Sequence, residues 1–240
     1  MSGVLHIEEA AEHVMLLRLN RPEARNAISL ELADALQGAL ADFRDNDRWR
    51  VAVLTGAPPA FCAGLDLRSF SAPDAPRHKV TEVVTSLPDL GKPIIAAVNG
   101  AAYTGGLEIV LSCDFAIAAQ EARFADTHAK IGALSGSGMG SRLPRAVGAH
   151  WAKQMMLTCA PVDAETALRI GLVNEVVPQD RLVARAVELA GMIAGHDPEL
   201  AQIAKSVVDR GTQATLAEAI DIEREALAER KKQGTMTWKT

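Results

Sequence analysis

The hydrophobic positions in the N-terminal part of the chain alternate between short aliphatic runs and longer segments with helical spacing. Residues 4–8 and 13–19 have the pattern of two strands of a hairpin. A helix is predicted next, because Ser29 can cap it and apolar residues recur every three or four positions as far as Phe43. The chain is therefore predicted to open with two strands and an amphipathic helix.

This alternation continues in the middle of the chain. Further strands are predicted at residues 51–56, 94–100 and 115–119, where β-branched and aliphatic residues dominate. Helices are predicted over part of residues 77–87 and from Gly105 onward. Strands that alternate with helices indicate β-α crossovers and parallel pairing, so the predicted fold class is α/β.

The pattern becomes largely helical in the last part of the chain, and we place a soft domain boundary near residue 178. Thr215 and Glu218 have the spacing of a capping box at a helix start. Three helices are predicted after the boundary, over residues 180–194, 197–209 and 215–232.

Composition and charge narrow the classes of function. The chain has 240 residues, 48% of them hydrophobic, and a formal net charge of −5 with no basic block, so we do not expect a nucleic acid partner. Its three cysteines form no CxxC pair and its six histidines show no ligand spacing, so we expect no metal site. The N-terminus lacks a signal-peptide pattern, and polar residues interrupt the longest apolar stretch, residues 93–119. We therefore expect a cytoplasmic protein that does not enter a membrane.

Two loops of the chain resemble each other. Residues 63–67 read A-G-L-D-L and residues 105–109 read G-G-L-E-I, and each follows a predicted strand. Small residues let a ligand approach the backbone, and a helix start leaves N–H groups without intrahelical acceptors. Two such loops on neighbouring strands can direct two N–H groups at one oxygen, as an oxyanion hole does. The alternative is that both are tight turns in which glycine fits and nothing binds.

The chain resembles the crotonase superfamily, the enoyl-CoA hydratase/isomerase proteins, over roughly residues 4–178. The resemblance rests on four motifs taken together: RPEARNA (21–27), AFCAGLDL (60–67), KPIIAAVNGAAYTGGLEIVLSCD (92–114) and AVGAHWAKQMMLTCAPVDAETALRIGLVNEVVP (146–178).

The resemblance implies a fold and a ligand. The fold is a ββα spiral core with an acyl-CoA site, here residues 1–178, followed by C-terminal helices, here residues 179–240, that form a homotrimer or hexamer. The ligands are acyl-CoA thioesters of fatty acid metabolism, with coenzyme A as part of the substrate and no separate cofactor. Apolar Ile220, Leu227 and Met236 beside charged faces of the C-terminal region agree with assembly through that region.

The resemblance also implies site residues. The oxyanion donors that match are the backbone N–H groups of Ala63 and Gly105. Arg25 and Lys92 are candidates for pairing with CoA phosphates, although Arg25 is equally well explained as a solvated loop charge. The residues expected at the CoA and substrate site are Ala24, Arg25, Ala63, Gly64, Leu65, Asp66, Lys92 and Gly105.

Glu108 is an ionisable acid in an otherwise apolar helix start. It matches one of two glutamates that hydratases of the family use to position and activate water. Burial in an apolar pocket would raise its pKa and suit it to proton transfer near neutral pH. The alternative is that Glu108 caps its own helix or pairs with a buried base.

His128 stands where the family usually has the second glutamate, in the stretch from Phe124 to Gly132. Three interpretations remain open: a working acid/base with Glu108, a binding residue in an enzyme with one acid, or a pocket histidine in a protein that binds acyl-CoA without turnover. Asp126 is an alternative partner acid. Ser135 is a second departure, because it replaces a proline of the family pattern.

The leading hypothesis is an enoyl-CoA hydratase-like enzyme with Glu108 and His128 as catalytic residues and an oxyanion-stabilised enolate. The alternatives within the same fold are double-bond isomerisation, thioester hydrolysis and decarboxylation, which share that intermediate. The remaining alternative is a non-catalytic acyl-CoA-binding protein.

Overall fold

The computed structural model describes residues 3–72, 74–232 and 234. It divides into two compact units, Met1–Gly195 and His196–Thr240. The division falls later than the boundary expected near residue 178, because helix α6 (Leu182–Ala194) packs on the sheet of the first unit. The role assigned to the C-terminal part stays a prediction.

Two sheets organise the first unit. The larger sheet has the order β1 (Leu5–Ala11), β2 (Val14–Leu19), β3 (Val51–Gly56), β5 (Ile94–Val98), β7 (Phe115–Ala119) and β10 (Glu175–Val177). The smaller sheet has the order β4 (Ala60–Cys62), β6 (Ala101–Tyr103), β8 (Arg123–Ala125) and β9 (Val162–Asp163). β1 and β2 form the predicted antiparallel hairpin, and the pairings from β2 to β10 are parallel. The four strands of the smaller sheet were not predicted, because two or three residues are too few to show a period.

The chain winds as a spiral in which each turn adds one strand to each sheet and then a helix. The three turns are β3-β4-α2 (His78–Ser86), β5-β6-α3 (Gly105–Ser112) and β7-β8-α4 (Met139–Thr158). This confirms the crotonase-like ββα spiral. Short elements complete the unit: α5 (Ala164–Arg169) and the 3₁₀ turns η1 (Pro22–Ala24), η2 (Leu87–Leu90), η3 (His128–Ile131) and η4 (Gln179–Arg181).

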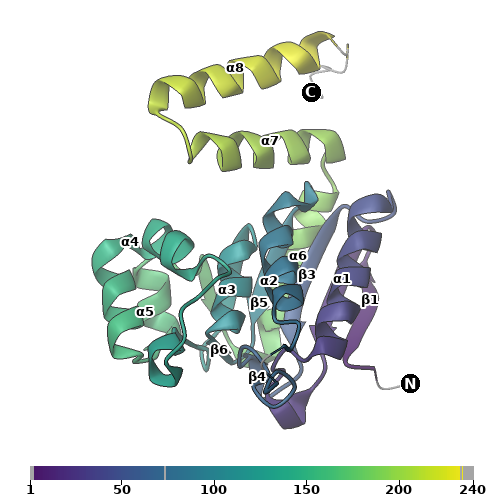
Figure 1. The fold of residues 1–240 in the computed structure, drawn as a ribbon. Helices are drawn as coiled ribbons and strands as arrows, with labels where there is room; N and C mark the ends of the chain where they lie inside the picture. The colour runs from purple at the N-terminus through teal and green to yellow at the C-terminus, as the bar shows by residue number, and fades with distance from the viewer. Residues whose placement is uncertain (1–2, 73, 233, 235–240) are drawn as a thin grey trace. The chain divides into compact units, whose positions relative to one another are not determined.

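Both faces of the larger sheet are buried over β2, β3, β5 and β7, whereas the edge strand β1 is largely exposed. Helices α1 (Leu30–Asp45), α2 and α3 lie side by side along one face (Figure 1). The predicted cap of α1 is present, since the Ser29 hydroxyl accepts the Leu32 N–H at 3.2 Å. Helix α6 covers the other face with a stripe of residues at a spacing of four, from Leu182 to Ala194. Two buried faces explain why these four central strands are nearly continuous apolar runs.

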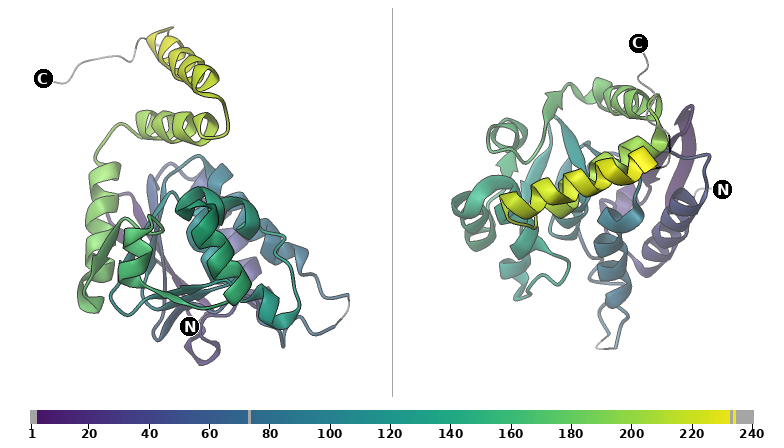
Figure 2. Two further views of the ribbon diagram at one scale, coloured as in Figure 1. Left: turned by 90° about the vertical axis from the view of Figure 1, so that its left-hand side faces the viewer. Right: turned by 90° about the horizontal axis from the view of Figure 1, so that it is seen from above.

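The second unit is a pair of helices, α7 (Pro198–Gly211) and α8 (Leu216–Lys232), joined by a short connection (Figure 2). The predicted capping box is present: Glu218 accepts the Thr215 N–H at 2.8 Å, and Thr215 Oγ1 accepts the Glu218 N–H at 3.4 Å. Arg230 joins the two helices by donating to Asp197 at 2.6 Å and to Glu199 at 3.2 Å. Met236 lies outside the described residues. Among the helices of the described segments, none combines the length and apolar character that a membrane crossing needs.

Candidate active site

A cavity of about 450 Å³ opens in the first unit where successive turns of the spiral end. Strands β4, β6 and β8 are parallel neighbours, so the loops that follow them leave the sheet at the same edge. These loops and the start of α2 line the cavity, which brings Leu65, Gly105, Glu108 and His128 together from three segments of the sequence. The two loops that resemble each other are therefore neighbours in space, as the sequence predicted.

The two loops touch through their backbones. A Cβ on Gly106 would lie only 2.1 Å from the carbonyl oxygen of Cys62, so this contact requires glycine. Gly64 has φ +99, and a Cβ there would lie 3.2 Å from the nitrogen of Gly105. The glycines thus allow the close approach that places backbone groups of one loop beside those of the other.

The backbone donors of the first loop differ from the sequence-based choice. The Ala63 N–H donates to the carbonyl of Arg25 at 3.0 Å, so it is not directed at a ligand. The Gly64 carbonyl accepts the Ile28 N–H at 2.8 Å, and the Asp66 N–H donates to the Ile28 carbonyl at 3.0 Å. Both bonds lie on the same side of the chain. Because successive groups of an extended chain face opposite sides, the intervening Leu65 N–H faces the other way.

Leu65 takes the place that the sequence interpretation assigned to Ala63. Its N–H has no acceptor within the described part of the chain, and its nitrogen would lie 3.6 Å from a Cβ built on Gly105. Gly105 is the first residue of α3, where an N–H lacks an intrahelical acceptor. The structure therefore pairs Leu65 with Gly105, and not Ala63 with Gly105, as adjacent donors at the cavity.

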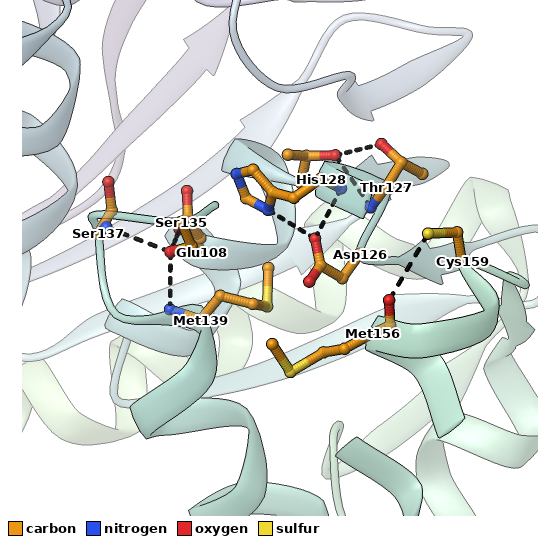
Figure 3. A network of polar contacts seen from close by, with 10 residues as sticks. Glu108, Asp126, Thr127, His128, Ser135, Ser137, Met139, Met156 and Cys159 are labelled. Atoms are coloured by element: carbon orange, nitrogen blue, oxygen red, sulfur yellow. Dashed lines mark hydrogen bonds and ion pairs between the residues drawn. The ribbon is translucent and has the colours of Figure 1, made fainter. Parts of the chain in front are cut away.

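Glu108 is buried, with 5% of its surface exposed, on the first turn of α3. Its carboxylate accepts a hydrogen bond from the Ser135 hydroxyl (Figure 3), and the Ser137 backbone N–H also stabilises its charge. Burial raises the pKa of Glu108, and the Ser135 hydrogen bond and the charge of His128 offset part of that rise. The side chain thus reaches across to the loop before α4 rather than capping its own helix.

His128 and Asp126 form a pair beside Glu108. Asp126 is 2% exposed, and its Oδ1 lies 2.6 Å from His128 Nδ1 and accepts the His128 backbone N–H at 3.1 Å (Figure 3). This hydrogen bond from the imidazole to the carboxylate raises the pKa of His128. With Nδ1 engaged, Nε2 is the ring atom left for a ligand in the cavity. Asp126 is thus the partner of His128, rather than a substitute for it.

The remaining expected residues surround the first loop. Arg25 is exposed and has φ 52, and it follows Ala24 at the end of η1. The Asp66 carboxylate accepts from Arg21 Nη2 at 2.9 Å and from the backbone of Arg68, so it fastens the loop. Sequence reasoning did not single out Arg21, although it lies in the RPEARNA motif. In the described segments, no group of three or more His, Cys, Asp and Glu side chains is arranged to hold a metal ion.

Lys92 does not join this site. It is 7% exposed, and its Nζ donates to the carbonyls of Phe43 and Asn46, each at 3.0 Å. These carbonyls belong to the end of α1, which lacks further intrahelical donors. The sequence-based assignment of Lys92 to a CoA phosphate is corrected accordingly, because its ammonium group is already bound inside the protein.

Substitution of Lys92 by Met is expected to lower the free energy of unfolding by about 1–3 kcal/mol, because it removes the Lys92 hydrogen bond to the buried Phe43 carbonyl and leaves the Asn46 carbonyl with the Trp49 N–H alone. KM for an acyl-CoA substrate should stay within about twofold of the parent value, since a twofold change is only about 0.4 kcal/mol. Urea unfolding and steady-state kinetics measure the two quantities. A large rise in KM with unchanged stability would instead support the assignment of Lys92 as a ligand of CoA.

The comparisons with known proteins agree with this geometry. The family model described as enoyl-CoA hydratase/isomerase matches residues 9–237. The mitochondrial enoyl-CoA hydratase of Pongo abelii is 37% identical over 214 residues, covering 88% of this chain and 74% of that protein. The short-chain-enoyl-CoA hydratase of Clostridium acetobutylicum is 34% identical over 229 residues, covering 93% and 88%. The crystal structure of enoyl-CoA hydratase from Bacillus anthracis superposes with a TM-score of 0.90 at 35% identity, covering 94% of this chain and 90% of that one. This chain belongs to the enoyl-CoA hydratase/isomerase family of the crotonase superfamily.

Proposed function

We propose that this protein adds water across the double bond of a 2-enoyl-CoA thioester, with coenzyme A as part of the substrate and no separate cofactor. The observation that carries the proposal is the convergence of two backbone donors, Leu65 and Gly105, with Glu108 and His128 around one cavity. The names of relatives support it, since they include a short-chain-enoyl-CoA hydratase and a crotonyl-CoA hydratase.

In this proposal the backbone stabilises the intermediate. The Leu65 and Gly105 N–H groups donate to the thioester oxygen, which gains negative charge as the enolate forms. Glu108, as a carboxylate, accepts a proton from water while the water oxygen bonds to Cβ. His128, as an imidazolium, delivers a proton from Nε2 to Cα. A proton passing from Glu108 to His128 then restores both groups.

The surroundings of the two groups support these roles. The carboxylate of Asp126 stabilises the protonated form of His128, which is the form that a general acid needs. Two donors, the Ser135 hydroxyl and the Ser137 N–H, stabilise the ionised form of Glu108, which is the form that a general base needs. The coupled pair is therefore expected to give a bell-shaped dependence of kcat/KM on pH.

The first experiment is incubation of the purified protein with 2-enoyl-CoA thioesters of short, medium and long acyl chain, followed by mass spectrometry. A product heavier by one water supports hydration. A product of unchanged mass would mean isomerisation, free CoA would mean thioester hydrolysis, and loss of carbon dioxide would mean decarboxylation. Bound but unchanged acyl-CoA would indicate a binding protein. The parent protein is compared with His128→Ala, which should lose hydration.

Asp126→Asn is expected to move the alkaline limb of the pH profile to lower pH. The carboxylate raises the pKa of His128, so its removal makes the imidazolium lose its proton at lower pH. Activity that requires the imidazolium is then lost earlier as the pH rises. Asp34→Asn, which removes an exposed carboxylate that pairs with Lys79, is the matched control. An unchanged alkaline limb in Asp126→Asn would remove His128 from the role of general acid.

The assembly is part of the proposal. We propose a homotrimer or hexamer formed through the C-terminal helices, supported by exposed Leu216, Ile220 and Leu227 on α8. Burial of such side chains between subunits is favourable by about 25 cal/mol per Å² of apolar surface. Sedimentation velocity at micromolar concentration tests this, and a monomer would contradict it.

A further inference from the structure

Ser135 lies in the loop between η3 and α4 and makes three polar contacts (Figure 3). Its hydroxyl bonds to Glu108 Oε1. The same oxygen lies 3.3 Å from the backbone nitrogen of Ser137 and 3.2 Å from that of Met139. This residue is also one of the two positions at which the chain departs from the family pattern.

The direction of these bonds follows from the number of hydrogens and lone pairs. A hydroxyl has one hydrogen and two lone pairs. Both backbone N–H groups are donors, so they occupy the two lone pairs of Ser135. The single hydroxyl hydrogen is therefore directed at Glu108, which accepts it. Because its lone pairs are occupied, the Ser135 oxygen is not presented as a nucleophile.

The same contacts connect Glu108 to a helix start. Met139 is the first residue of α4, and its N–H belongs to the positive end of that helix. A hydroxyl that accepts from a helix N-terminus becomes a better donor to a carboxylate, because the bonds polarise one another. The Ser137 N–H, which donates to the Ser135 oxygen at 3.3 Å, also faces Glu108 and lowers its pKa, so the two acceptors share this one hydrogen.

The other charged groups around Glu108 are few among the described residues. His128 and Asp126 face it from the segment after β8. Arg77 lines the cavity from the residue before α2. Arg142 of α4 donates to the Ser112 hydroxyl at 2.7 Å, one turn along α3 from Glu108. Ser135 is thus a neutral residue that donates a hydrogen bond directly to the Glu108 carboxylate, in addition to these charged neighbours.

We propose that Ser135 is a positioning residue that keeps Glu108 ionised and fixes one of its carboxylate oxygens, so that the other oxygen faces the reacting water. This inference rests on the proposed function of Glu108 as general base. It assigns to the chain's own serine, at a position of proline in the family pattern, the task of offsetting the burial of the carboxylate.

The test is Ser135→Ala, with Ser135→Thr as the variant that retains a hydroxyl. In Ser135→Ala the acid limb of the kcat/KM profile should move to higher pH by about one unit, since one unit corresponds to about 1.4 kcal/mol, near the lower end of the range for a hydrogen bond to a charged group. kcat should fall about tenfold at pH values below the shifted limb, recover at higher pH, and leave KM unchanged. Ser135→Thr should restore the position of the limb. Ser141→Ala, which removes an exposed hydroxyl from the first turn of α4, is the control.

A second readout does not depend on turnover. Infrared difference spectra between each protein and its Glu108→Gln counterpart report the titration of the Glu108 carboxyl group directly. A carboxyl titration that moves to higher pH in Ser135→Ala supports the inference even if hydration were not the reaction. An unmoved titration, or a loss of rate that is equal at all pH values, would overturn it. Circular dichroism verifies that each variant is folded.

Discussion

Glu108→Gln is expected to lower kcat for hydration by about 10²–10⁴-fold, the range typical of losing a general base. The amide has nearly the shape of the carboxylate and still accepts the Ser135 hydrogen bond, but it cannot take a proton from water. Binding should change little, because the thioester oxygen is held by backbone N–H groups. Steady-state kinetics and the Kd of a saturated acyl-CoA measure the two effects separately.

A matched control and a stability measurement accompany this substitution. Glu82→Gln alters an exposed glutamate on α2 and should leave the rate unchanged. Because the folded state raises the pKa of Glu108, it binds that proton more tightly than the unfolded state, and stability falls as the pH rises from 4.5 through the folded-state pKa. Glu108→Gln removes this loss, so its Tm at neutral pH should exceed that of the parent. A rate within tenfold of the parent would contradict the role of Glu108.

Gly64→Ala is expected to lower kcat/KM by about 10²-fold, comparable with the loss of one oxyanion donor. The new Cβ would lie 3.2 Å from the Gly105 nitrogen and 3.1 Å from the Tyr103 carbonyl oxygen, so the two loops must move apart. The paired N–H groups of Leu65 and Gly105 would then no longer converge on one oxygen. Kinetics with a 2-enoyl-CoA give the rate.

Gly91→Ala is the control for backbone strain. Gly91 also has a positive φ, +75, but a Cβ there meets nothing within 4 Å. Both substitutions should cost about 1–2 kcal/mol of stability, because alanine disfavours a left-handed backbone. Only Gly64→Ala should lose rate in addition. Equal rates in the two variants would show that the approach of the two loops is not needed for catalysis.

Local sequence patterns were sufficient to predict an interaction wherever the interacting groups are close in sequence. The Ser29 cap of α1 and the capping box at Thr215 were predicted, because their partners lie three residues away. Gly105 and Glu108 were placed together at the start of α3 for the same reason, since three residues make almost one helical turn. The alternation of strands and helices likewise predicted the α/β class.

Contacts between groups from distant segments of the sequence could be identified only from the folded structure. Lys92 has the residue type of a phosphate ligand, yet it binds carbonyls at the end of α1, 46 and 49 positions away in sequence. Ala63 and Leu65 lie two residues apart in one motif, and only the hydrogen bond from Ala63 to the Arg25 carbonyl shows which N–H is already used. The short strands of the smaller sheet were not predicted, because they are defined by hydrogen bonds to strands from neighbouring turns of the spiral.

The amino-acid sequence was sufficient to predict the α/β class, the resemblance to a family, and two residues that line the cavity, Glu108 and His128. These follow from spacing within short segments, which a sequence states directly. The folded chain was needed to show which backbone N–H pairs with Gly105, that Asp126 binds His128, and that Ser135 donates to Glu108. The direction of a hydrogen bond and the burial of a charge depend on neighbours from other turns of the chain, and these determine which protonation state each group holds.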